Sequence, residues 1–365
     1  MTFKPPRLRS IRWSAGIVAL VSLSSLMACN KRPPLEHLVP SDIETTVFLI
    51  GDAGEQDPRN PSVVLDSLFA QASVAPDRSV IVYLGDNVYP DGIPEEGRAQ
   101  YADARRRLSA EVNAVPRGAR GIFVPGNHDW AGETAFGLYS IRLQGRMITN
   151  LAKGNNVQML PENGCPGPVV VDAGRLRLIA LDTQWWLHDF IVRDSLSNCI
   201  NTIGEVTGAL RQDVEQVADG RIVVVAGHHP LMTGGQHGGY CGLSGFFRRL
   251  SSLSQDILGG QNRTMRDSLA SAFKKKKPLV YASGHDHNLQ LMRGPEAQYL
   301  LVSGAGSSDK TECAVYLRES YYTSQHRAGF MRLDIMKGKG ALLTSFEFLG
   351  SGARGYPFSR WLELR

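Results

Sequence analysis

The sequence predicts an α/β fold built on βαβ units, because short apolar runs alternate with patterns of helical periodicity. The runs are mostly rich in β-branched residues, as buried strands of parallel sheets are. They comprise residues 47–50, 80–84, 121–124, 176–181, 221–226 and 279–282. Three series with apolar residues every three or four positions predict amphipathic helices, over residues 101–115, 206–217 and 265–273.

The pattern changes beyond Gln298, where apolar runs follow one another without an obvious helix between them. These runs are residues 299–302, 330–335 and 341–348. We expect them to form a second, more antiparallel sheet. The lysine run 274–277, at the end of the third helical series, is expected to cap that helix, since cations suit the C-terminal end of the helix dipole.

Composition describes an ordinary globular protein. The chain has 365 residues, of which 42% are hydrophobic and 21% charged, enough to bury a large core and too apolar for a disordered chain. The net charge is +5, but Lys4, Arg7, Arg9 and Arg12 lie in a segment that we expect to be removed, which leaves about +1. Composition therefore gives no case for a nucleic-acid partner.

The N-terminus predicts an export signal. A basic stretch to Arg12 precedes an apolar run, residues 15–27, that is too short to span a membrane comfortably. Leu26-Met27-Ala28-Cys29 resembles the lipobox of bacterial lipoproteins, which are cut before the cysteine and acylated on it. We therefore expect a signal peptide over residues 1–28, a tether over 29–44, one domain over 45–365, and a lipid-anchored protein of the bacterial cell envelope. The alternative is a plain secretory signal.

Acylation of Cys29 would leave an even number of cysteines: Cys165, Cys199, Cys241 and Cys313. Four cysteines allow two disulfides in three connectivities. No Cys-x-x-Cys spacing indicates a zinc or redox site, so these cysteines are expected to be structural disulfides of an oxidising compartment. Free buried thiols are the alternative.

Five motifs carry the chemistry of the chain, and each begins with glycine directly after an apolar run. They are Gly51-Asp52, Gly85-Asp86-Asn87-Val88-Tyr89, Gly126-Asn127-His128-Asp129, Gly227-His228-His229 and Gly284-His285-Asp286-His287. The carboxyl ends of parallel strands form the ligand-binding edge of an α/β sheet, and glycine lets loops there approach closely. Together the motifs supply oxygen and imidazole ligands for two adjacent metal ions, which predicts a metal-dependent phosphoester hydrolase.

The order and spelling of these motifs resemble the calcineurin-like metallophosphoesterases and, within them, the purple acid phosphatases of the tartrate-resistant type. The resemblance covers roughly residues 46–349. Tyr89 distinguishes this subfamily, and the run 284–290, Gly-His-Asp-His-Asn-Leu-Gln, has the tartrate-resistant spelling throughout. The resemblance implies a four-layer α/β/β/α sandwich.

The resemblance also implies the ligands of two metal ions. The first ion would take Asp52, Asp86, Tyr89 and His287, and the second Asp86, Asn127, His228 and His285, with Asp86 bridging. Two carboxylates and a phenolate suit Fe³⁺, whereas imidazoles, an amide and one carboxylate suit Fe²⁺, Zn²⁺ or Mn²⁺. Alternatively, Tyr89 packs beside the end of its strand.

Two further histidines are candidate catalytic residues. The metal pair is expected to cleave small phosphate monoesters by attack of a metal-bound hydroxide, as in acid phosphatases. His128 resembles the histidine that assists the leaving group, and Asp129 could orient it. His237, in a glycine-rich segment, is similar to a substrate-side histidine, although a lone loop histidine can simply be solvated.

The resemblance implies disulfides Cys199–Cys241 and Cys165–Cys313. Trp185 and Trp186 either line the pocket or pack against the sheet. Two rival functions stay open: a metal-dependent phosphodiesterase or nucleotide pyrophosphatase, and a non-catalytic envelope lipoprotein that binds ligands with the same fold. A purely structural metal site is disfavoured because the two ligand sets leave coordination positions for water or substrate.

Overall fold

The computed structural model describes residues 40–365 apart from 58, 61, 133, 189–198, 243, 244, 246, 249–252, 309, 339, 350–357, 364 and 365. The chain divides into two units, residues 1–38 and 39–365, and the second unit contains every described helix and strand. The expected signal peptide and Cys29 lie outside the described residues. Among the helices that are described, none is long and apolar enough to cross a bilayer.

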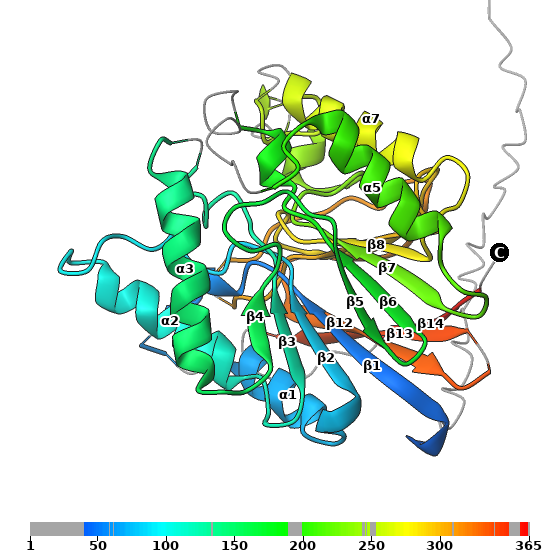
Figure 1. Ribbon diagram of the computed structural model, residues 1–365, viewed down its shortest axis with the longest axis horizontal. Coiled ribbons are helices and arrows are strands. Elements are labelled where there is room, and N and C mark those ends of the chain that lie inside the picture. The colour runs from blue at the N-terminus through cyan, green and yellow to red at the C-terminus, as the bar shows by residue number, and fades with distance from the viewer. Residues whose placement is uncertain are drawn as a thin grey trace, which may run out of the picture. The chain divides into compact units, whose positions relative to one another are not determined.

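Two seven-stranded sheets face each other, with helices on their outer faces (Figure 1). Both faces of the first strand are apolar, which is why its sheet is covered on both sides. Val47 and Leu49 point into the core between the sheets, whereas Phe48 and Ile50 pack under the helices. All four side chains are fully buried. This arrangement confirms the predicted α/β/β/α layering.

The first sheet is parallel at one end and antiparallel at the other. In spatial order its strands are β14 (Ser359–Leu362), β13 (Ala341–Phe348), β12 (Ala328–Met336), β1 (Ile43–Ile50), β2 (Ser79–Tyr83), β3 (Arg120–Phe123) and β4 (Val157–Met159). Strands β1 to β4 are parallel, and β12 to β14 add antiparallel neighbours on the other side of β1. Since β1 begins at Ile43, the last two residues of the expected tether belong to the sheet.

The second sheet has parallel strands at its centre. Its spatial order is β11 (Ser320–Ser324), β9 (Leu289–Arg293), β10 (Tyr299–Ser303), β8 (Val280–Ser283), β7 (Ile222–Ala226), β6 (Leu176–Ala180) and β5 (Val169–Ala173). Strands β6, β7, β8 and β10 run parallel, and β5, β9 and β11 are antiparallel to their neighbours.

The expectation that the runs beyond Gln298 form the second sheet is correct for residues 299–302 and wrong for the other two runs. Of the strands described beyond Gln298, only β10 and β11 lie in that sheet, whereas β12 to β14 return to the first sheet and pair beside β1, with Val47 opposite Leu333. Apolar alternation shows that a strand is buried, but both sheets bury the same kinds of side chain in one shared core. The pattern therefore cannot say which sheet a strand joins.

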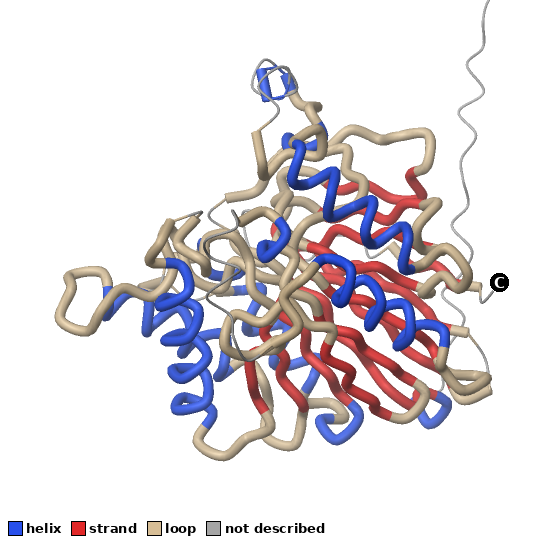
Figure 2. The backbone as a smooth tube through the Cα atoms, turned by 45° about the horizontal axis from the view of Figure 1, so that its top comes forward, coloured by secondary structure: helices blue, strands red, loops and turns tan. Residues whose placement is uncertain are grey.

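Helices form the two outer layers (Figure 2). On the first sheet pack α1 (Val63–Ala72), α2 (Tyr101–Asn113) and α3 (Gly137–Ala152), and on the second α5 (Ile203–Glu215) and α7 (Gly260–Ala272). The predicted helices correspond to α2, α5 and α7. A capping box begins α5, in which the side chains of Thr202 and Glu205 accept each other's backbone N–H groups.

The lysine run follows α7 and contacts a different helix from the expected one. Lys276 Nζ donates to the carbonyl of Val217, just beyond the end of α5, at 3.2 Å. For Lys276 the expectation that the run caps its own helix is therefore wrong. This lysine links the ends of two helices that pack side by side on the second sheet.

The disulfides are Cys165–Cys199 and Cys241–Cys313, with Cα atoms 5.8 and 6.1 Å apart. The pairing implied by the resemblance is wrong. Cys199 lies just before α5 and packs against the core under that helix, near Cys165, which follows β4. Cys241 lies in the loop that carries His237, beside the segment of Cys313.

Candidate metal centre

Each of the five motifs begins where a strand ends, at β1, β2, β3, β7 and β8. Because these strands are parallel within their sheets, their carboxyl ends meet at one edge of the sandwich. Backbone hydrogen bonds join the two sheets there: Gly51 N–H donates to the carbonyl of Ser303 at 2.7 Å. The structure brings all seven predicted ligands into one cluster at this edge.

The first group of ligand atoms surrounds the Tyr89 hydroxyl. Tyr89 Oη lies 3.0 Å from Asp52 Oδ1, 3.1 Å from Asp86 Oδ2 and 3.0 Å from His287 Nε2. His287 Nε2 and Asp52 Oδ1 are 3.3 Å apart. Tyr89 therefore faces its predicted co-ligands and does not merely pack beside its strand.

The second group surrounds His228. Its Nε2 lies 3.0 Å from Asn127 Oδ1 and 3.2 Å from Asp86 Oδ2. His285 Nδ1 lies 3.1 Å from both Asn127 Oδ1 and His228 Nε2. The oxygen Asp86 Oδ2 thus belongs to both groups.

Backbone groups form hydrogen bonds with other polar atoms of these side chains. His285 N–H donates to Asp52 Oδ2 and His128 N–H to Asp86 Oδ1, each at 2.9 Å. His228 Nδ1 contacts the carbonyl of Leu84 at 2.9 Å, and His285 Nε2 that of Gln255 at 3.1 Å. A carbonyl accepts only, so these ring nitrogens carry the hydrogens, and in the neutral rings the opposite nitrogens turn lone pairs into the cluster.

This donor set fits metal ions. When the imidazoles of the second group are neutral, their nitrogens, the amide oxygen and the carboxylate oxygen are all acceptors, and acceptors about 3 Å apart then need a cation among them, either a proton or a metal ion. Two atoms bound at right angles to one ion, each about 2.1 Å from it, are also about 3.0 Å apart. The observed spacings match that value.

Electrostatics in the cluster favour positive charge. Burial by itself lowers the pKa of His228 and of His287, but the carboxylates of Asp86 and Asp52 outweigh it and raise each to about 9. Burial and the same carboxylates raise the pKa of Tyr89 well above its ordinary value. Protons and metal ions therefore compete for these side chains.

Two glycines allow the loops to meet. A Cβ on Gly126 would lie 2.2 Å from Asp86 Oδ1, and one on Gly85 2.5 Å from His228 Nδ1. Gly85 also has a φ of +91°, which favours glycine. Both positions require the absence of a side chain next to a candidate ligand.

Asp129 does not orient His128, contrary to the expectation. Its buried carboxylate accepts the backbone N–H groups of Asn87, Val88 and Gly126 at 2.9, 3.0 and 2.9 Å. It also accepts from the side-chain amides of Asn87 and Gln144. Asp129 therefore joins the loops after β2 and β3, since their buried N–H groups need an acceptor.

His128 is held by other contacts. Its Nδ1 lies against the carbonyl of Pro90, and its ring packs on Tyr89 with centroids 4.1 Å apart. Together with His237, Arg248, Lys310 and Glu312, it borders a cavity of about 470 Å³ that opens onto the cluster. The cavity places His128 beside any ligand held there.

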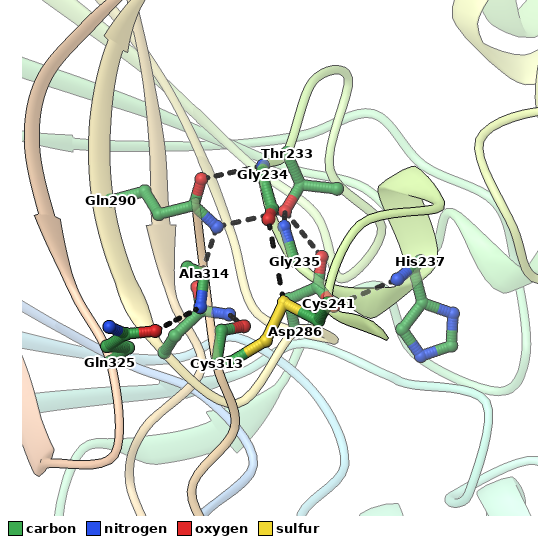
Figure 3. Close-up of a disulfide and its surroundings, with 11 residues drawn as sticks. Thr233, Gly234, Gly235, His237, Cys241, Asp286, Gln290, Cys313, Ala314 and Gln325 are labelled. Atoms are coloured by element: carbon green, nitrogen blue, oxygen red, sulfur yellow. Dashed lines mark hydrogen bonds between the residues drawn. A yellow bond between two sulfur atoms is a disulfide. The ribbon is translucent and has the colours of Figure 1, made fainter. Parts of the chain in front are cut away.

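The loop that carries His237 is fastened by hydrogen bonds to Asp286 and by a disulfide to Cys313 (Figure 3). Asp286, between candidate ligands His285 and His287, accepts from Thr233 Oγ1 and from the backbone N–H of His237. The disulfide Cys241–Cys313 ties the loop to the segment that carries Lys310 and Glu312. The His237 ring packs against that of His285, with centroids 3.8 Å apart and ring planes tilted by 39°, so it is not a freely solvated side chain.

Several site residues were missed by the sequence analysis. Thr183 Oγ1 accepts the backbone N–H groups of His228 and His229, each at 3.0 Å. The ring of His229 contacts Thr183 Oγ1 and Gln255 Oε1, so both of its nitrogens are used. Thr183 follows a predicted strand, as the five motifs do, which is a signal that could have found it. Gln255 carries no such signal.

Trp185 and Trp186 do not line the cavity. Both are fully buried, in the core between the second sheet and helices α5 and α7. Of the two alternatives left open by the sequence, packing is confirmed.

Comparisons with known proteins agree with this geometry. Residues 45–289, about two thirds of the chain, match the calcineurin-like phosphoesterase family. Purple acid phosphatase 7 of Arabidopsis thaliana is 22% identical over 334 residues, which cover 87% of each chain.

Two solved structures share the fold. GAP50, the anchor in the inner membrane complex of Plasmodium, aligns with a TM-score of 0.56 and 15% identity over 88% of this chain and 90% of its own. The purple acid phosphatase PPD1 of yellow lupin aligns with a TM-score of 0.53 and 14% identity over 87% of this chain and 54% of its own. The chain thus belongs to the calcineurin-like phosphoesterases and is a metallophosphoesterase related to the purple acid phosphatases.

Proposed function

We propose that this protein is an exported phosphohydrolase that uses two metal ions to cleave small phosphate monoesters, in the manner of an acid phosphatase. The observation that carries the proposal is the pair of four-atom ligand groups that share Asp86 Oδ2. Fe³⁺ would be held by Asp52, Asp86, Tyr89 and His287. A divalent ion, Fe²⁺, Zn²⁺ or Mn²⁺, would be held by Asp86, Asn127, His228 and His285.

When bound, such a metal pair neutralises the charge of the phosphate and activates water at modest pH. The protein's own part is to place groups around the ester. His128 borders the cavity beside Asn127, with Nδ1 against Pro90, which leaves Nε2 to protonate the leaving oxygen. His237, which packs against His285, is the second candidate to contact substrate.

The charge of the cavity wall supports a monoester substrate. Arg248 and Lys310 border the opening with His128 and His237, and the acidic residues of the lining are Glu312 and the proposed metal ligand Asp86. A phosphate monoester carries up to two negative charges and a diester only one, so these two cations, together with two bound metal ions, would favour the monoester. The relative rates with nitrophenyl phosphate and its bis ester test this choice, and faster cleavage of the bis ester would favour a phosphodiesterase.

Export is supported by the two disulfides, which persist in oxidising compartments. We propose that acylated Cys29 anchors the protein in the cell envelope. The test is fractionation of wild type and Cys29→Ala after labelling with a radioactive fatty acid. Label on wild type alone supports the anchor, and label on neither protein contradicts it.

The ligand assignment is tested by Asp86→Ala, which removes the shared oxygen. We expect loss of both metals by elemental analysis and of nearly all hydrolysis. Asp103→Ala, at a half-exposed position on α2, is the matched control and should retain both. Full activity in Asp86→Ala would overturn the assignment.

A further inference from the structure

We propose that Asp256 is a positioning residue that fixes the ring of His237 over the candidate metal centre. The inference deepens the proposed function and rests on it. Asp256 is 2% exposed and does not line the cavity, so it acts through the side chains that it contacts. Nothing in the local sequence, Ser-Gln-Asp-Ile, identifies it.

Asp256 holds two cavity residues with one oxygen. Its Oδ1 accepts from His237 Nδ1 at 2.8 Å and from Arg248 Nη1 at 3.0 Å. A buried carboxylate needs such partners, and hydrogen bonds between charged groups are stronger than neutral ones. Because Nδ1 of His237 donates to Asp256, Nε2 is the nitrogen left to face a substrate.

The neighbours of Asp256 hold other imidazoles of the site. The carbonyl of Gln255 accepts from His285 Nε2 at 3.1 Å, and its side chain contacts His229 Nε2 at 2.8 Å. Ile257 N–H donates to the carbonyl of His237 at 3.0 Å. Three consecutive residues, 255–257, therefore orient three histidines.

This arrangement fixes the relation between His237 and the metal centre. Asp256 holds the His237 ring at Nδ1, Asp286 holds the backbone N–H of His237, and the ring lies against that of His285 with centroids 3.8 Å apart. Without the carboxylate of Asp256, the ring can rotate about its side-chain bonds and take the other tautomer. His237 would then lose a defined position toward the substrate while the proposed metal ligands keep theirs.

The test compares Asp256→Ala and Asp256→Asn in wild-type and His237→Ala backgrounds. For Asp256→Ala we expect kcat with nitrophenyl phosphate to fall about 10- to 100-fold, the range for losing a residue that orients a site group, with metal content and KM nearly unchanged. Asp256→Asn keeps an oxygen acceptor for His237 Nδ1 and should recover much of the loss. In the His237→Ala background, Asp256→Ala should cost no more than about twofold, because the ring that it positions is absent and Arg248 is its remaining cavity partner.

A second measurement does not depend on activity. With ¹⁵N-labelled histidine, nuclear magnetic resonance should show a hydrogen on His237 Nδ1 in wild type and in Asp256→Asn, but mixed tautomers in Asp256→Ala. Asp172→Ala is the matched control, since Asp172 also pairs with two basic side chains, Arg177 and Arg221, and none of the three lines the cavity. It should change neither the His237 signals nor kcat.

Two results would overturn the inference: unchanged His237 signals in Asp256→Ala, or an equal loss of kcat from Asp256→Ala in both backgrounds. Absence of hydrolysis and of metal in the wild type would instead refute the proposed function. In that case a tautomer change in Asp256→Ala would still support the positioning role. If Asp256→Ala does not fold, Asp256→Leu, which fills the space without an acceptor, tests the same coupling against His237→Ala.

Discussion

Asp129→Ala should destabilise the loops that carry the candidate ligands Asp86 and Asn127, although Asp129 is not itself a predicted ligand. The carboxylate accepts the backbone N–H groups of Asn87, Val88 and Gly126 and the side chains of Asn87 and Gln144. Alanine leaves three buried N–H groups without an acceptor, at about 1–3 kcal/mol each. The free energy of unfolding should therefore fall by about 3–9 kcal/mol, a large part of the usual 5–15 kcal/mol.

Urea unfolding followed by tryptophan fluorescence measures this loss, because Trp130 is buried next to Asp129. Elemental analysis should also show reduced metal content, since the loops of Asp86 and Asn127 separate. Gln144→Ala removes one of the five bonds and should cost about 1 kcal/mol. The reasoning is refuted if Asp129→Ala unfolds within about 1 kcal/mol of wild type or if Gln144→Ala costs as much.

Three further predictions concern the leaving group, the meeting of the loops and pH. His128→Ala should keep both metals and lower kcat about 10²- to 10⁴-fold, measured with nitrophenyl phosphate; loss of metal would show instead that His128 is structural. Gly126→Ala places a methyl group 2.2 Å from Asp86 Oδ1 and should abolish metal binding, whereas Gly204→Ala in α5, where nothing lies within 4 Å, should stabilise by up to about 1 kcal/mol in urea unfolding. Burial raises the pKa of Asp182 to about 8 despite the hydrogen bond from Trp130, so the folded state binds this proton more tightly and stability falls as pH rises from about 4 to 8. Asp182→Asn removes this titration. Its free energy of unfolding minus that of wild type should therefore rise by up to about 4 kcal/mol between pH 5 and pH 8, and a difference that does not change with pH would contradict the assignment.

The sequence predicted the strands and motifs well because they depend on local patterns. An apolar run that ends in glycine and a polar side chain predicts both a buried strand and a site residue, which is why Asp52, Asp86, Asn127, His228 and His285 converge as expected. The parallel arrangement of the strands then places these side chains at one edge. The prediction therefore required no knowledge of the distances between these side chains.

Contacts between distant segments were not predictable in the same way. Which sheet receives β12, which cysteine lies beside Cys313, and which groups surround Asp129 all depend on how separate segments pack. Asp256 shows the limit most clearly: its role follows from its contacts with His237 and Arg248, and its neighbours in the sequence carry no motif. Buried polar side chains that hold loops together are visible only in three dimensions.

The central claim is that two metal ions share Asp86, and anomalous diffraction from crystals of the full protein grown with iron, zinc and manganese tests it most directly. The account predicts two peaks: one among Asp52, Asp86, Tyr89 and His287, and one among Asp86, Asn127, His228 and His285. Data collected on both sides of each absorption edge identify the metals. A single peak, or metal bound away from Asp86, would contradict the account.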